Sequence, residues 1–187
     1  MININQKIPD ISFDIYWKGN FKSVKLHDYL GKWLILLFYP ADFSFVCPTE
    51  LKEAADLYQD FAKLGAEVVS VSTDTKYVHK AWHDSSPMIK TIEYPMAADP
   101  TGKLSKGLGT YIEDEGLSLR GSFIIDPEGK LIAMDIHSND IGRSMAEVKR
   151  KLEAAIYVRG HEGEVCPASW KPGDKTLKPG PELVGKI

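Results

Sequence analysis

The sequence has few cysteines and no long apolar segment, and both absences narrow the class of protein. Its 187 residues include two cysteines, Cys47 and Cys166, which are too few for a small secreted domain held together by disulfides. The longest apolar run, 33–39, is far too short to cross a bilayer and fits a buried strand better. The sequence therefore predicts a protein with free thiols and no membrane-spanning helix.

Concentrated positive charge and targeting patterns are also lacking. The formal net charge is -3, and no Lys/Arg cluster offers the positive face that binding to phosphate backbones requires. The first residues show neither the basic and apolar regions of an export signal nor an Arg-rich transit pattern. We therefore expect a cytoplasmic protein that has neither nucleic acid nor a membrane as its partner.

The N-terminal half predicts a hairpin followed by a strand-helix-strand unit. Residues 11–16 and 21–25 are rich in strand formers and flank the turn signal Lys18-Gly19-Asn20. The run 33–39 does not alternate, as expected for a central strand covered on both faces. A helical stripe from Leu51 to Leu64, closed by Gly65, precedes a strand at 67–73, and Asp74 is expected to cap the next helix.

The C-terminal half predicts a second hairpin, a closing helix and an extended tail. Asp126-Pro127-Glu128-Gly129 suits a tight turn between antiparallel strands at 121–125 and 130–136. Ser144 and Glu147 have the spacing of a helix capping box. Prolines and glycines without an apolar period then predominate. We predict a thioredoxin-like α/β sandwich at residues 1–158, opening with the N-terminal hairpin, and a C-terminal tail at 159–187 that carries Cys166.

Cys47 lies where a thiol becomes reactive. It follows the buried strand and precedes Pro48, a residue favoured in the first helical turn, so its sulfur is expected at a helix N-terminus. The free N–H groups and the positive helix end there favour the thiolate. Glu50 occupies the place of the second thiol in a Cys-x-x-Cys motif. Oxidised Cys47 must therefore be resolved by a distant thiol, for which Cys166 is the one internal candidate, by an external thiol, or not at all.

The residues around Cys47 resemble a known active-site motif. Pro40 and Ser44 precede Cys47 with the spacing of the Pro-x-x-x-Thr/Ser-x-x-Cys motif of the peroxiredoxins. Further segments are similar, in the same order, to the bacterial alkyl hydroperoxide reductase C group; they span 71–74, 80–83, 120–126, 163–170 and 183–187. The resemblance extends over nearly the whole chain, and it implies a two-cysteine peroxiredoxin with the variant thioredoxin-like fold of that family.

The resemblance implies a role for each of six residues. Cys47 would be the peroxidatic cysteine, whose thiolate attacks a hydroperoxide and becomes a sulfenic acid, and Cys166 would be the resolving cysteine. The supporting roles would be distributed as follows: Ser44 binds the peroxide, Pro40 shields the sulfur, Arg120 stabilises the thiolate and the developing charge, and Glu50 orients Arg120. Many family members have threonine in place of Ser44, so a somewhat altered peroxide fit is expected without loss of activity.

The resemblance also implies partners. Cys166 would come from the partner subunit of an antiparallel homodimer, and five dimers would assemble into a decamer. The disulfide would be reduced by a flavoprotein disulfide reductase of the AhpF type or by a thioredoxin-like or glutaredoxin-like protein. No cofactor is expected. Because the chain lacks a Gly-Gly-Leu-Gly insertion and a C-terminal Tyr-Phe helix, we predict resistance to inactivation by overoxidation to sulfinic acid.

Other features of the sequence permit different interpretations. His79 and His83 have the i, i+4 spacing of some metal ligands, but without a third ligand we expect surface or interface imidazoles and no metal site. A non-catalytic redox sensor or chaperone-like assembly, switched by oxidation of Cys47, is a competing function, which catalytic turnover would distinguish. The missing second cysteine of Cys-x-x-Cys argues against a general disulfide reductase.

Overall fold

The computed structural model describes residues 2–186 and forms two compact units, Met1–Met145 and Ala146–Ile187. The predicted tail, 159–187, falls within the second unit. Ile187, the last residue of the C-terminal run compared with the peroxiredoxins, lies outside the described residues.

The first unit is built on a seven-stranded mixed sheet with the strand order β2-β1-β5-β4-β3-β8-β9. Its strands are β1 (Ser12–Trp17), β2 (Asn20–Lys25), β3 (Trp33–Phe38), β4 (Ala66–Ser72), β5 (Met96–Ala98), β8 (Arg120–Ile125) and β9 (Leu131–His137). β3, β4 and β5 are parallel, and every other neighbouring pair is antiparallel. This central mixed sheet confirms the predicted thioredoxin-like architecture.

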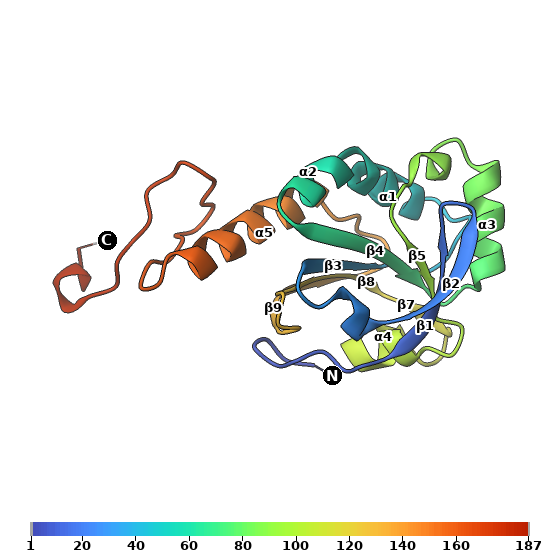
Figure 1. Cartoon of the computed structure of the whole chain (residues 1–187), viewed down its shortest axis with the longest axis horizontal. Helices are drawn as coiled ribbons and strands as arrows, with labels where there is room; N and C mark the ends of the chain where they lie inside the picture. Colours follow the sequence, from blue (N-terminus) through green and yellow to red (C-terminus); the bar gives the residue numbers. More distant parts are fainter. Residues whose placement is uncertain (1, 187) are drawn as a thin grey trace. The chain divides into compact units, whose positions relative to one another are not determined.

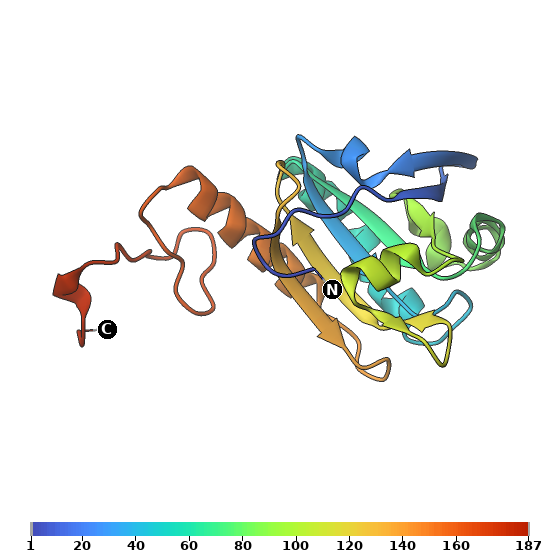
Figure 2. The ribbon, with the colours of Figure 1, turned by 90° about the horizontal axis from the view of Figure 1, so that it is seen from below.

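The predicted central strand, β3, lies in a sheet that has helices on both faces. Every residue of β3 is buried. Two helices, α1 (Cys47–Asp56) and α2 (Tyr58–Lys63), cover one face of the sheet, and α4 (Lys103–Leu108) lies on the other (Figure 1). Leu36 of β3 belongs to a core that includes Leu104 and Leu108 of α4. The N-terminal segment crosses the α4 face (Figure 2) and pairs through Lys7 with Lys130.

The helix predicted from Leu51 to Leu64 is divided in two. At Leu57 the backbone stays in the right-handed helical region but departs from regular helix geometry (φ -95°, ψ 0°), and this residue ends α1 and precedes α2. Gly65 closes the segment as predicted, with the positive φ of +74° that glycine adopts without strain. The prediction of a helix after the cysteine was therefore correct in extent but wrong in continuity.

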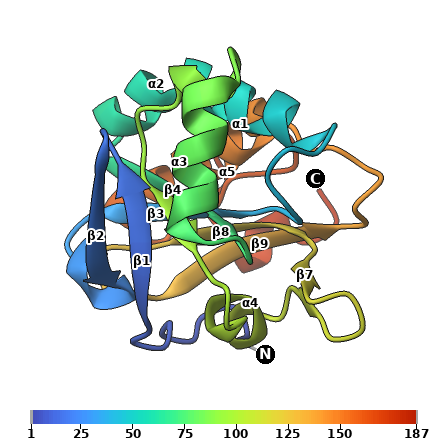
Figure 3. The same cartoon turned by 90° about the vertical axis from the view of Figure 1, so that its right-hand side faces the viewer.

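The cap of the next helix was also assigned to the wrong residue. α3 (Lys76–Ser85) runs beside β1 and β5 (Figure 3) and is capped by Thr75, whose hydroxyl accepts from the Val78 N–H at 3.4 Å. The Asp74 carboxylate instead accepts from the Asp42 N–H at 2.8 Å and from the Ser72 hydroxyl at 2.9 Å. Asp74 therefore holds the loop before Cys47 and does not cap the helix.

Both predicted hairpins are present. Lys18 and Gly19 each have positive φ between β1 and β2, as a type I′ turn requires, and Gly129 has φ +80° before β9. A third, short hairpin of β6 (Tyr111–Ile112) and β7 (Leu117–Ser118) was not predicted. Two 3-10 helices complete the unit, η1 (Leu26–Tyr29) and η2 (Ile89–Thr91).

The second unit consists of most of α5 (Met145–Gly160) and the segment after it. That segment contains one isolated antiparallel bridge, between Val165 and Leu177, and the 3-10 helix η3 (Pro181–Leu183). Within residues 2–186, no helix combines the length and the apolar character that crossing a membrane demands.

Candidate functional site

Cys47 is the first residue of α1, as its position before Pro48 predicted. β3 delivers the chain to a loop at residues 39–46, and α1 begins directly after it. The Cys47 side chain has no exposed surface. A sulfur at this position faces the positive end of the helix, which favours a negative charge on it.

Arg120 provides a second source of positive charge at the sulfur. As the first residue of β8, it donates from Nη1 to the Cys47 sulfur at 3.3 Å and to Glu50 Oε2 at 2.8 Å. Its Nε donates to the Asn139 carbonyl at 2.9 Å. Burial alone would lower the pKa of the guanidinium, but its bonds to Cys47 and Glu50 raise the pKa above its usual value. Arg120 therefore remains charged beside the sulfur.

Glu50 is held by a second arginine that the sequence did not single out. Arg143 donates to Glu50 Oε1 from its backbone N–H at 2.7 Å and from Nε at 2.9 Å, and it donates from Nη2 to Oε2 at 3.1 Å. Burial raises the pKa of Glu50, but the bonds from Arg143 and the charge of Arg120 outweigh it and bring the pKa below its usual value. Glu50 is thus an ionised carboxylate bonded to both Arg120 and Arg143.

The charges of this cluster balance when Cys47 is a thiolate. Arg120, Glu50 and Arg143 expose 3%, 2% and 6% of their surfaces, so solvent screens them little. Two guanidinium groups and one carboxylate leave one positive charge, and a thiolate at Cys47 neutralises it. The only signal in the sequence for Arg143 was an arginine beside Gly142 in the loop before α5, which by itself does not indicate burial.

Pro40 and Ser44 lie in the loop between β3 and α1. Pro40 is buried, and Ser44 is half-buried. The Ser44 hydroxyl donates to the Ala41 carbonyl at 2.8 Å. The helix begins only at Cys47, so the loop itself carries the Ser44 hydroxyl.

His79 is fully buried, which contradicts the expectation of a surface or interface imidazole. Its Nδ1 lies 2.7 Å from Asp42 Oδ2, and its Nε2 lies 3.0 Å from the Ala97 carbonyl. Because a carbonyl only accepts, Nε2 carries a hydrogen, and the ring and Asp42 share one further proton. Asp42 also accepts from the Tyr39 hydroxyl at 2.7 Å. The pair therefore fixes the loop that leads to Cys47. Among residues 2–186, no group of three or more potential metal ligands gathers.

Cys166 belongs to the second unit and is a free, half-buried thiol. Its S–H donates weakly to the Ala154 carbonyl of α5 at 3.9 Å. Burial raises the pKa of Cys166, the nearby Arg150 opposes this change, and the Glu164 carboxylate reinforces it. In this conformation the thiol form of Cys166 is therefore favoured over the thiolate more than in a free cysteine.

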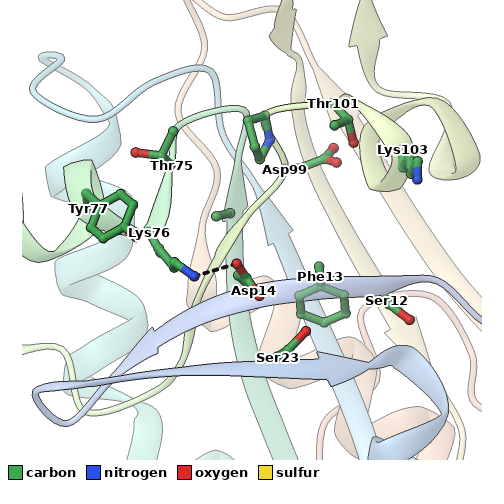
Figure 4. Close-up of a pocket in the computed structure, with 12 residues that line it drawn as sticks. Ser12, Phe13, Asp14, Ser23, Thr75, Lys76, Tyr77, Asp99, Thr101 and Lys103 are labelled. Atoms are coloured by element: carbon green, nitrogen blue, oxygen red, sulfur yellow. Dashed lines mark hydrogen bonds and ion pairs between the residues drawn. The ribbon is translucent and has the colours of Figure 1, made fainter.

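A separate cavity of about 490 Å³ is lined by the β1–β2 hairpin, the start of α3 and the loop before α4 (Figure 4). Lys76 is paired with Asp14 at 2.7 Å inside it. Asp99 is engaged with the start of α4, where it accepts from the Leu104 and Ser105 N–H groups at 3.1 and 2.8 Å. These charges already have partners, and no cysteine lines the cavity. This cavity therefore offers no thiol for redox chemistry.

Comparison with known families gives two matches. Residues 4–134 match the AhpC/TSA family, and residues 157–186 match the C-terminal domain of 1-Cys peroxiredoxin. Two similar curated proteins are both named alkyl hydroperoxide reductase C. The one from Salmonella typhimurium is 49% identical and the one from Pseudomonas aeruginosa is 47% identical, in each case over 98% of both chains.

Solved structures agree with these matches. The structure of Enterococcus faecalis AhpC is 48% identical, with a TM-score of 0.87 over 89% of this chain and 100% of that one. A reduced 2-Cys peroxiredoxin of Plasmodium vivax is 30% identical, with a TM-score of 0.91 over 96% of this chain and 94% of that one.

Proposed function

This chain belongs to the AhpC/TSA family of peroxiredoxins, and from that premise we propose that it is a thiol-dependent peroxidase that reduces hydrogen peroxide and alkyl hydroperoxides at Cys47. The observation that carries the proposal is the position of the Cys47 sulfur, at the first residue of α1 and 3.3 Å from the Arg120 guanidinium. A sulfur at this position is a good nucleophile, and the Arg120 guanidinium beside it is a charged donor for the leaving oxygen of the peroxide.

In the first step the Cys47 thiolate attacks the terminal oxygen of the hydroperoxide. A sulfur–oxygen bond forms and the oxygen–oxygen bond breaks, so the sulfur is oxidised to a sulfenic acid while the peroxide is reduced. The leaving oxygen takes up a proton and departs as water or as an alcohol.

Four side chains and one backbone N–H group support that step in our proposal. Ser44 donates its hydroxyl to the peroxide, giving up its bond to Ala41, and the Cys47 backbone N–H joins it. Arg120 uses Nη1 and Nε for its protein partners, which leaves Nη2 for a peroxide oxygen. Glu50 keeps the guanidinium in place, and the buried Pro40 excludes water from the sulfur.

The second step converts the Cys47 sulfenic acid into a disulfide, which protects the Cys47 sulfur from further oxidation. Cys166 of the partner subunit in a homodimer attacks the sulfenic sulfur, forming an intersubunit disulfide and releasing water. A dithiol reductant then reduces that disulfide; a flavoprotein reductase of the AhpF type, a thioredoxin and a glutaredoxin-like protein are the candidates. We further propose assembly of the dimers into a decamer, and action in the cytoplasm.

Single-turnover oxidation tests the role of Cys47. Reduced protein is mixed with an equimolar amount of hydrogen peroxide, and peroxide loss is followed together with the mass of each cysteine peptide. We expect rapid loss for the parent chain and for Cys166→Ser, and none above the uncatalysed rate for Cys47→Ser. Equal peroxide loss in the Cys47→Ser chain would refute the proposal.

Mixed variants test the intersubunit disulfide. Cys47→Ser chains retain only Cys166, and Cys166→Ser chains retain only Cys47, so neither can form the disulfide within one chain. After subunits are exchanged and peroxide is added, we expect a covalent heterodimer joined through Cys47 and Cys166. If the parent chain forms the disulfide and the mixture does not, resolution occurs within one subunit and the proposed dimer mechanism is wrong.

A further inference from the structure

One carboxylate, two residues before Cys166, ties together three segments of the second unit. Glu164 Oε2 accepts from the Tyr157 hydroxyl at 2.8 Å and from the Thr176 hydroxyl at 2.5 Å. The ammonium group of Lys178 lies 3.6 Å from Oε1. Tyr157 belongs to α5, whereas Thr176 and Lys178 lie on the returning part of the tail. The Glu164 side chain is 18% exposed, so water competes only partly for these bonds.

The Cys166 sulfur shares the face of the tail that carries this carboxylate. Val165 and Leu177 exchange both backbone hydrogen bonds, at 2.9 and 3.0 Å. Because side chains alternate along an extended segment, those of Glu164 and Cys166 both lie opposite that of Val165. Cys166 contacts the carbonyl of Ala154, and Ala154 is one helical turn from Tyr157 on α5. The contact that holds Glu164 on α5 therefore also holds the Cys166 sulfur against the helix.

The docked sulfur is poorly prepared to react. Attack on another sulfur requires a thiolate. Burial against α5 raises the pKa of Cys166, and the Glu164 carboxylate adds to this effect despite the opposing charge of Arg150. Release of the segment removes the burial. Undocking thus makes the sulfur mobile and raises its thiolate fraction at the same time.

We propose that Glu164 is a latch for the resolving cysteine: its bonds to Tyr157 and Thr176 set the fraction of time in which Cys166 is free to attack oxidised Cys47. The inference rests on the role of Cys166 in the proposed function. Once released, the Cys166 thiolate attacks the sulfenic sulfur of Cys47, a sulfur–sulfur bond forms, the sulfur–oxygen bond breaks, and the hydroxide takes a proton to leave as water. Glu164 is a positioning residue, since it acts through Cys166.

A second attachment keeps the tail on α5 when the latch opens. Trp170 is 2% exposed, and its carbonyl accepts from Arg150 Nη1 at 3.0 Å. Its indole N–H donates to the Asp174 carbonyl at 3.1 Å. These hydrogen bonds use none of the latch residues, and the contact of the Trp170 ring with the Tyr157 ring, at 5.0 Å between centroids, does not involve the Tyr157 hydroxyl. Weakening the latch is therefore expected to free the short segment around Cys166 without detaching the following loop, so it accelerates resolution.

The matched test removes one hydroxyl at a time. Tyr157→Phe keeps the ring that stacks on His161 at 3.9 Å, and Thr176→Val keeps the side-chain shape. Lys178→Met is the control, because the Lys178 side chain is 81% exposed and solvent screens its charge. In a Cys47→Ser background, the rate of Cys166 alkylation by iodoacetamide measures opening. We expect an increase of about tenfold for either hydroxyl variant, which corresponds to one hydrogen bond to a charged group, and little change for the control.

The second measurement uses chains that keep both cysteines. In a single turnover with hydrogen peroxide, the rate of Cys47 oxidation is expected to stay unchanged in Tyr157→Phe and Thr176→Val, while disulfide formation accelerates. Alkylation at the parental rate in both variants would overturn the latch. Faster alkylation without faster disulfide formation would overturn its control of resolution. Absence of any Cys47–Cys166 disulfide in the parent chain would instead refute the resolving role itself, so the two failures can be told apart.

Discussion

Replacement of Arg143 by lysine tests whether the buried charge cluster supports both the fold and the reactive sulfur. The Arg143 side chain makes four hydrogen bonds: two to Glu50, one to the Gly121 carbonyl at 2.6 Å and one to the Ser122 hydroxyl at 3.2 Å. Lysine preserves the charge but lacks the planar fork, so it cannot hold both carboxylate oxygens of Glu50 and reach Gly121 together.

The expected loss follows from those bonds. A hydrogen bond to a charged group contributes about 1.5–3 kcal/mol, and removing one partner of a buried charged pair costs about 3–5 kcal/mol. Arg143→Lys is therefore expected to lower the free energy of unfolding by about 2–3 kcal/mol, and Arg143→Ala by about 3–5 kcal/mol. Because Glu50 then holds Arg120 less firmly, Cys47 oxidation should slow by about tenfold in Arg143→Lys, the equivalent of about 1.4 kcal/mol.

Urea unfolding and stopped-flow oxidation by hydrogen peroxide measure the two effects. Lys52→Gln is the control, since it breaks an exposed ion pair with Asp56 that contributes less than about 1 kcal/mol. If Arg143→Lys unfolds at the parental urea concentration and oxidises at the parental rate, the cluster supports neither the fold nor the sulfur, and our reasoning about it is wrong.

Three further changes are predicted. The pKa of Glu50 is lower in the folded protein than its usual value of 4.5, so its carboxylate stabilises the fold fully above pH 4.5 and loses this effect as the pH falls through the folded pKa. The urea concentration at the unfolding midpoint should therefore fall less steeply with decreasing pH in Glu50→Gln than in the parent chain. His79→Leu leaves a carboxylate oxygen of Asp42 buried without its imidazole and should cost about 3–5 kcal/mol in urea unfolding, a loss that a surface histidine would not produce. Ser44→Thr retains the hydroxyl and restricts its rotamer, so the rate constant for Cys47 oxidation should change by less than about tenfold; abolition of the reaction would contradict the loop geometry.

Local signals in the sequence were sufficient for the elements that carry the site. Lys18-Gly19 specified the first hairpin because the turn needs two residues with positive φ. The unbroken apolar run of β3 identified a strand buried on both faces, and Pro48 marked the start of α1 at Cys47. These features depend on neighbouring residues alone, so a single sequence contains them.

The remaining features depend on contacts between distant segments. No local sequence pattern marks Arg143 as buried. Its bonds to Glu50 form because the loop before α5 packs against α1. The burial of His79 on α3 depends on its bond to Asp42, which comes from a loop far earlier in the sequence. Asp74 was expected to cap α3, but its carboxylate accepts from the Asp42 N–H of a distant loop, and Thr75 caps the helix instead.

The central claim is that Cys47 is oxidised first and Cys166 resolves it, and peptide mass mapping with non-reducing gels tests it most directly. The parent chain, Cys47→Ser and Cys166→Ser are each treated with an equimolar amount of hydrogen peroxide. We expect a Cys47–Cys166 cross-linked dimer in the parent chain alone and a sulfenic acid on Cys47 in Cys166→Ser. A parent chain that stays monomeric on the gel, with Cys47 unmodified, would contradict it.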